Sequence, residues 1–103
     1  MISYPKLKKL SIDLVDDFFD GDLFAHYGPG ETYSSKTKLD DIEVSAAKRA
    51  VMISRVNKVF APEVGAGWRD VRPVDTVKCS TIGDFIKLMC KHAGLGIPVG
   101  EPK

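Results

Sequence analysis

The stretch STIGDFIKLMCKHAG, residues 80–94, carries a complete set of signals for one α-helix. Thr81 stands before Ile82 and three residues before Asp84, a spacing in which each polar side chain can bond to the other's backbone N–H at a helix start. Apolar residues then recur on one helical face: Ile82, Phe85, Ile86, Met89 and Ala93. Gly94 can adopt the left-handed conformation that ends a helix. The stretch therefore predicts an amphipathic helix that buries one side in a core.

Two further segments repeat this helical pattern. The first begins near Pro5 and ends near Gly21, with apolar residues at helical spacing: Leu7, Leu10, Leu14, Val15 and Phe18. The second spans roughly residues 44–60 and is expected to end before Pro62, which cannot donate a backbone hydrogen bond. Its predicted buried face comprises Val44, Ala47, Val51, Met52, Val56, Val59 and Phe60.

Long irregular segments separate these helices. Residues 22–38 are rich in Gly, Pro, Ser and Thr, a composition typical of a loop. Residues 61–75 form a second irregular segment, in which residues 68–71 can form a short helical turn. We therefore predict an all-α fold, a small three- to four-helix bundle with long loops. Residues 1–94 are expected to form the single helical domain, and residues 95–103 a flexible C-terminal tail.

The composition excludes several classes of protein. The chain has 103 residues and a formal net charge of +1, so its total charge indicates neither a nucleic-acid partner nor a membrane surface. No apolar run approaches the roughly 20 residues that cross a bilayer. The first nineteen residues contain acids where a secretory signal needs an uninterrupted apolar core. We therefore expect a cytoplasmic location.

Three short motifs mark the start and end of the second predicted helix and the start of the last one. KLDDIEVSAA (residues 38–47) precedes the second helix, VNKVFAPEV (56–64) ends it, and STIGDFIKLM (80–89) opens the last helix. In this order they resemble the acyl and peptidyl carrier proteins, in which a long loop, a second helix, a short turn and a capped last helix follow one another. The resemblance covers residues 37–93, about two-thirds of the chain, and the segment 6–18 corresponds to the family's first helix.

This resemblance implies a non-catalytic carrier. Such a protein holds an acyl or peptidyl intermediate on a 4'-phosphopantetheine arm, attached to a serine at the start of the second helix; here that residue is Ser45. The implied partners are a phosphopantetheinyl transferase and acyl-transferring or synthase enzymes. The family's Asp-Ser-Leu triplet is absent, however, and counting back from Phe60 by the family's spacing reaches Ala46 rather than Ser45.

Alternative interpretations remain for the same residues. Ser45 suits a helix N-cap, which stabilises a helix by about 1 kcal/mol. The second helix carries the basic residues Lys48, Arg49 and Arg55, whereas the family's is usually acidic. These side chains are either a solvated helix surface or a face that recruits an acidic protein partner. In the second case the chain is an interaction module without a prosthetic group.

The residues do not predict a metal site or an enzyme. Cys90 and His92 are two apart on a helix and so face different directions. Zinc normally takes four ligands, and the remaining histidine, His26, lies far away in the sequence. Both cysteines are expected to stay reduced, outside any disulfide. No serine or cysteine has a sequence signature that ties it to His26 or His92 as a catalytic pair.

Overall fold

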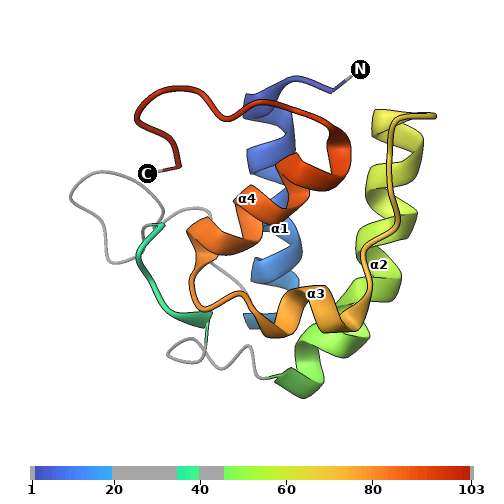
Figure 1. Ribbon diagram of the computed structural model, residues 1–103. Coiled ribbons are helices and arrows are strands. Elements are labelled where there is room, and N and C mark those ends of the chain that lie inside the picture. The colour runs from blue at the N-terminus through green and yellow to red at the C-terminus, as the bar shows by residue number, and fades with distance from the viewer. Residues whose placement is uncertain (1, 20–34, 40–45, 103) are drawn as a thin grey trace.

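The computed structural model describes residues 2–19, 35–39 and 46–102 and shows four helices in them (Figure 1). Their bounds are α1 Tyr4–Phe19, α2 Ala46–Val64, α3 Pro73–Val77 and α4 Ile82–Ala93. Within these residues the only β-type pairing is an isolated antiparallel bridge between Lys38 and Thr81. The predicted all-α fold is confirmed.

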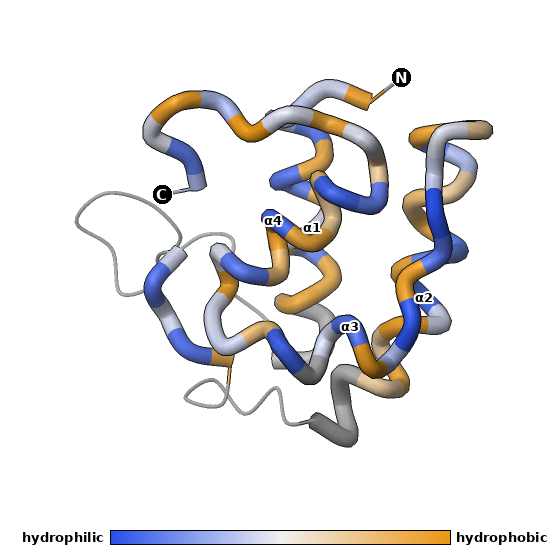
Figure 2. The backbone as a smooth tube through the Cα atoms, viewed as in Figure 1, coloured by the Kyte–Doolittle hydropathy of each residue, from blue (hydrophilic) through white to orange (hydrophobic). Residues whose placement is uncertain are grey.

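The core lies where α1, α2 and α4 meet. Helices α1 and α4 pack against each other, α2 contacts both α1 and α3, and α3 leads into the start of α4 (Figure 1). Hydrophobic and hydrophilic residues alternate along each of the longer helices, as expected of helices with one buried side (Figure 2). The largest fully buried side chains come from all three long helices and the 35–39 segment: Leu7, Ile12, Val15, Leu39, Met52, Phe60, Ile82, Phe85, Ile86 and Met89.

Helix α4 has the predicted ends. The Asp84 backbone N–H donates to Thr81 Oγ1 at 3.1 Å, and Asp84 Oδ2 accepts from the Ser80 and Thr81 N–H groups at 3.0 and 3.2 Å. At the other end Gly94 has a φ of 69°, and its N–H returns to carbonyls of the last turn. These bonds satisfy backbone groups that a helix end otherwise leaves unpaired.

Helix α2 differs from its prediction in two ways. It continues through Pro62 to Val64, so the expected stop before Pro62 is wrong. Proline costs the helix one hydrogen bond, but its fixed φ suits a helix, and the chain turns only at Gly65, whose φ is 87°. The buried face is also rotated: Ile53 is buried, whereas Val51 is 62% exposed. Met52, Val56 and Phe60 are four residues apart and define the buried line, which leaves Val51 outside it.

The short third helix lies later in the chain than predicted. We call residues 65–72 the α2–α3 link; its second half, from Trp68, is not helical, and the helical turn comes at Pro73–Val77. Pro73 suits the first helical position because the missing N–H has no helical partner there. Asp75 Oδ2 accepts the Arg72 N–H at 2.9 Å and caps the turn. The local capping signal therefore decides where α3 begins.

The 35–39 segment is fastened to the start of α4. The Leu39 N–H donates to the Ser80 carbonyl at 2.9 Å, the Ile82 N–H to the Thr37 carbonyl at 3.0 Å, and the Gly83 N–H to the Ser35 carbonyl at 2.9 Å. A Cβ on Gly83 would lie 2.9 Å from both Ser35 Cβ and Ser35 O. Such a distance is below ordinary van der Waals contact, so the close approach requires glycine.

Gly83→Ala is therefore expected to lower the free energy of unfolding by about 1–2 kcal/mol, since overpacking outweighs the better helix propensity of alanine. Urea denaturation followed by circular dichroism measures this change. Gly67→Ala is the matched control, because nothing lies within 4 Å of the added Cβ there. An unchanged or higher stability of Gly83→Ala would contradict the close packing.

The last residues run back over the helices. Leu95 packs against the core, and Lys8 Nζ lies 3.2 Å from Glu101 Oε2. Pro102 Cγ lies 3.3 Å from the place of a Cβ on Gly83. The predicted flexibility of residues 95–103 stays a prediction, because these contacts give the position of the tail and no measure of its motion. None of the helices in the described part of the chain has the length and apolar character needed to cross a membrane.

Candidate functional site

The predicted attachment residue and the predicted basic face fall at the first half of α2. Ser45 lies outside the described residues, but one peptide bond joins it to Ala46, the first residue of α2. Lys48 and Arg49 belong to the first turns of that helix, and their side chains lie outside the described part. Arg55 is exposed. That these residues form a site therefore stays a prediction. The exposure of Arg55 is compatible with contact between this residue and a partner.

The outer side of α2 combines an apolar side chain with basic ones. Val51, Arg55 and Lys58 are exposed, and their spacings of four and three residues place them on one helical face. We call these three residues the α2 outer strip. The strip lies away from the buried line of the same helix. An exposed valine beside two cations is a surface that can contact a partner through both apolar and charged groups.

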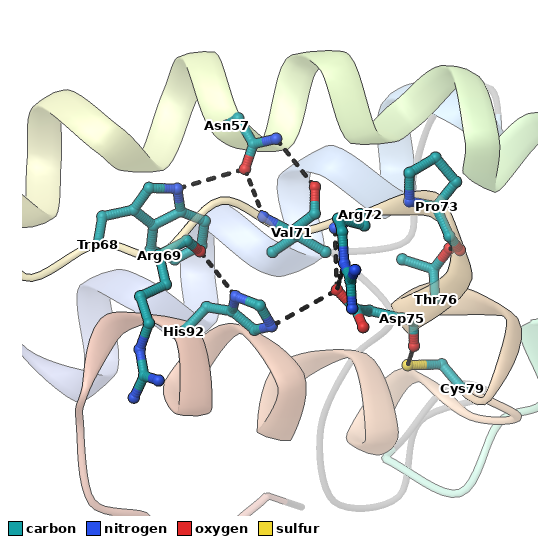
Figure 3. A network of polar contacts seen from close by, with 10 residues as sticks. All are labelled: Asn57, Trp68, Arg69, Val71, Arg72, Pro73, Asp75, Thr76, Cys79 and His92. Carbon is teal, nitrogen blue, oxygen red and sulfur yellow. Dashed lines mark hydrogen bonds and ion pairs between the residues drawn. The ribbon is translucent and has the colours of Figure 1, made fainter.

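A side chain of α2 holds the α2–α3 link in place (Figure 3). Asn57 Oδ1 accepts the Val71 N–H at 2.8 Å and the Trp68 Nε1–H at 3.3 Å, and Asn57 Nδ2 donates to the Val71 carbonyl at 3.0 Å. The Trp68 ring also stacks on Phe60, with centroids 5.2 Å apart and 14° between the planes. On the α2 side, the link therefore depends on one side-chain amide and one aromatic pair.

His92 fastens the same link to α4 from the opposite side (Figure 3). Its Nδ1 lies 2.7 Å from the Arg69 carbonyl and so donates to it, while the Arg69 N–H donates to the His92 carbonyl at 3.0 Å. His92 Nε2 lies 3.9 Å from Asp75 Oδ2. The Arg72 backbone N–H lowers the pKa of Asp75 below its ordinary value of 3.8, against a smaller opposing effect of burial, and neighbouring positive groups lower it further. The His92 ring therefore lies between a carbonyl and a carboxylate that is held ionised.

Two pockets open on the side of the molecule that carries the start of α4. One, of about 310 Å³, lies between α3 and α4 and is lined by Lys78, Lys87, Lys91 and His92 among others. We call it the lysine pocket. The second, of about 320 Å³, lies between Ser35, the first turn of α4 and the last residues of the chain. Both volumes are at the small end of the range of ligand sites.

The two cysteines are buried and outside any disulfide, as predicted. Burial raises the pKa of Cys90 to about 11, so the thiol stays protonated and weakly nucleophilic. Burial likewise raises the pKa of Tyr4 to about 12, with the charge of Glu101 adding to the effect. Among residues 2–19, 35–39 and 46–102, no three His, Cys, Asp or Glu side chains lie together as a metal site requires.

Sequence reasoning overlooked Asn57 and did not find the role of His92. Each is a single polar residue on a helix, and its shortest hydrogen bond is to a backbone group of the link, a kind of partner that has no sequence signature. Only the spacing of Lys87 and Lys91, one turn apart, is visible in the sequence as a local basic pair.

Comparisons of the chain with protein-family profiles, with curated proteins and with solved structures found no match. The functional assignment therefore rests on the motifs of the chain and on the geometry of the described residues.

Proposed function

We propose that this chain is an acyl-carrier-like protein that tethers an acyl or peptidyl intermediate through a 4'-phosphopantetheine arm on Ser45. The observation that supports this proposal is the start of the described part of α2 at Ala46, the residue that follows Ser45 in the sequence. The order of a long first helix, a long second helix, a short third helix and a capped fourth helix supports it too. That order is the one that the resemblance to carrier proteins implies.

The start of α2 is a favourable place for a phosphodiester. The first N–H groups of a helix have no intrahelical partner, and they carry the positive end of the helix dipole. A negative charge placed there at the surface gains about 0.3–1 kcal/mol. The same groups stabilise a phosphate without any special side chain. Lys48 and Arg49 follow within the first turn and add positive charge to this end of the helix.

The chemistry at Ser45 is a group transfer from coenzyme A. Ser45 Oγ attacks the phosphorus that bears the pantetheine, a P–O bond to the nucleotide breaks, and adenosine 3',5'-bisphosphate leaves. A phosphopantetheinyl transferase supplies the catalytic groups, so the carrier itself needs none. The α2 outer strip lies on the same helix and offers Arg55 and Val51 for contact with the transferase and with acyl-transferring or synthase enzymes.

The test is the intact mass of the protein after co-expression with a broad-specificity phosphopantetheinyl transferase. We expect a gain equal to one phosphopantetheine group and loss of that gain in Ser45→Ala. Ser54→Ala is the matched control, since Ser54 is an exposed serine of the same helix whose hydroxyl donates to the Val51 carbonyl at 2.9 Å. No gain in the unchanged protein, or a gain that persists in Ser45→Ala, would contradict the proposal.

A second candidate function is a non-catalytic interaction module. The observation that favours it is Val51, which is 62% exposed on a helix whose residues Met52, Ile53, Val56 and Phe60 are buried. In this function the α2 outer strip binds an acidic protein partner, and no prosthetic group is needed. A partner that binds the unmodified chain and binds Ser45→Ala equally well is the result expected of this candidate and not of the first.

A further inference from the structure

Three lysines surround the lysine pocket without a salt bridge. Lys87 and Lys91 come from α4, and Lys78 follows the last residue of α3. All three are exposed at the pocket's rim. Within the described part of the chain none of them forms a salt bridge, whereas Lys6, Lys8 and Lys9 of α1 each do. Lys78 contributes to lowering the pKa of Asp75, so part of its charge acts on that carboxylate. Three lysines against two carboxylates still leave the lining of the pocket with an excess of positive charge.

The two carboxylates that also line the pocket have other roles. Asp84 accepts two backbone N–H groups at the start of α4, and Asp75 accepts the Arg72 N–H at the start of α3. Hydrogen bonds from backbone N–H groups satisfy these oxygens where they stand. Turning either carboxylate towards a lysine would leave a helix start uncapped, at a cost of about 1 kcal/mol. The capping bonds thus hold both carboxylates at the helix starts, where their charge offsets part of the charge of the three lysines.

We propose that the lysine pocket binds a small molecule that carries a diphosphate group, with Lys78, Lys87 and Lys91 as the anion-binding residues. Lysine ammonium groups bind phosphate oxygens as point charges from several directions. Lys87 and Lys91 are one helical turn apart, roughly 5–6 Å between their Cβ atoms. On this spacing the two flexible side chains can reach both phosphates of one diphosphate group. Lys78 approaches from the other element.

The shape of the pocket favours a compact ligand. Its volume of about 310 Å³ exceeds that of a single phosphate and leaves room for an organic part. Leu88 lines the pocket and is half-buried, so it offers that part an apolar wall. His92 closes another side, where its ring is already oriented by the Arg69 carbonyl. A concave site with an apolar wall and converging charges is typical of small-molecule binding. The site does not involve Ser45 and is independent of the function proposed above.

Isothermal titration calorimetry of the whole chain with inorganic pyrophosphate tests the proposal. We expect saturable binding at low ionic strength, weaker binding of inorganic phosphate, and loss of affinity as sodium chloride approaches about 0.5 M. Removing a charge-assisted hydrogen bond weakens binding about tenfold or more. The double variant Lys87→Gln/Lys91→Gln should therefore bind about a hundredfold less tightly, and Lys78→Gln about tenfold. Lys58→Gln, on the α2 outer strip, is the matched control and should bind as the unchanged protein does.

The two sets of variants separate binding from folding. Lys78 and the α4 lysines belong to different elements, so a loss shared by both variants, with unchanged circular dichroism, supports a common ligand site. Three outcomes would overturn the proposal: no binding of pyrophosphate at millimolar concentration, equal binding by the double variant, or tighter binding of a polyglutamate peptide at the same lysines. The last of these would assign the pocket to an acidic protein partner instead.

Discussion

Phe60→Ala is expected to lower the free energy of unfolding by about 3–5 kcal/mol, enough to remove a large part of the stability of a small domain. Phe60 has no exposed surface and packs α2 into the core. Its ring also stacks on Trp68, so its removal opens a cavity and takes away the aromatic surface on which the α2–α3 link rests. The effect therefore reaches beyond α2.

Trp68 provides the measurement, because it is the single tryptophan of the chain. In Phe60→Ala we expect its emission to shift to longer wavelength even without denaturant, and the urea midpoint to fall. Val51→Ala is the control on the same helix: Val51 is exposed, and its replacement should change stability by less than about 0.5 kcal/mol. Equal stabilities of the two variants would contradict the core described above.

Asn57→Ala is expected to cost about 2–4 kcal/mol, the second-largest effect of the changes considered. The amide serves three partners at once: the N–H and carbonyl of Val71 and the indole N–H of Trp68. Alanine leaves these groups without a protein partner, and Val71 is buried, so its backbone groups have little access to water. An unsatisfied buried group costs about 1–3 kcal/mol, and water is expected to reach the indole.

Amide hydrogen exchange measured by NMR locates this loss. The Val71 amide should exchange slowly in the unchanged protein and much faster in Asn57→Ala, while amides in the middle of α4 stay protected. Ser54→Ala, one turn earlier on α2, removes only an exposed hydroxyl and should leave the exchange of Val71 unchanged. Continued protection of Val71 in Asn57→Ala would show that the link is held by something else.

The sequence predicted those parts of the fold whose causes are local. Thr81, Asp84 and Gly94 fix both ends of α4 by contacts within four residues, and the spacing of α4's apolar residues placed its buried face correctly. The buried face of α2 could not be predicted from local sequence alone. Ile53 and Val51 are similar apolar residues beside the same buried line, and only packing against the rest of the molecule decides that Ile53 turns inward. Pro62 does not end α2, since a proline in the last turn of a helix disrupts little.

The candidate sites were less predictable for the same reason. Lys87 and Lys91 are neighbours in any α-helix, but Lys78 joins them only because the chain reverses between α3 and α4. Asn57 binds a backbone atom 14 residues away, and His92 binds one 23 residues away. The side chains of a sequence contain no pattern that predicts such backbone partners. Ser45 is predicted from the order of the motifs alone, and its modification stays a prediction.

The α2–α3 link connects α2 and α4 through side-chain hydrogen bonds on both of its sides. Asn57 holds Val71 from α2, and two residues earlier Arg69 is held by His92 from α4 (Figure 3). This short bridge is a direct path between the helix that carries the outer strip and the histidine that closes the lysine pocket. If binding at one surface shifts this bridge and changes the affinity of the other surface, the reverse effect has the same size, because coupling between two binding equilibria is reciprocal.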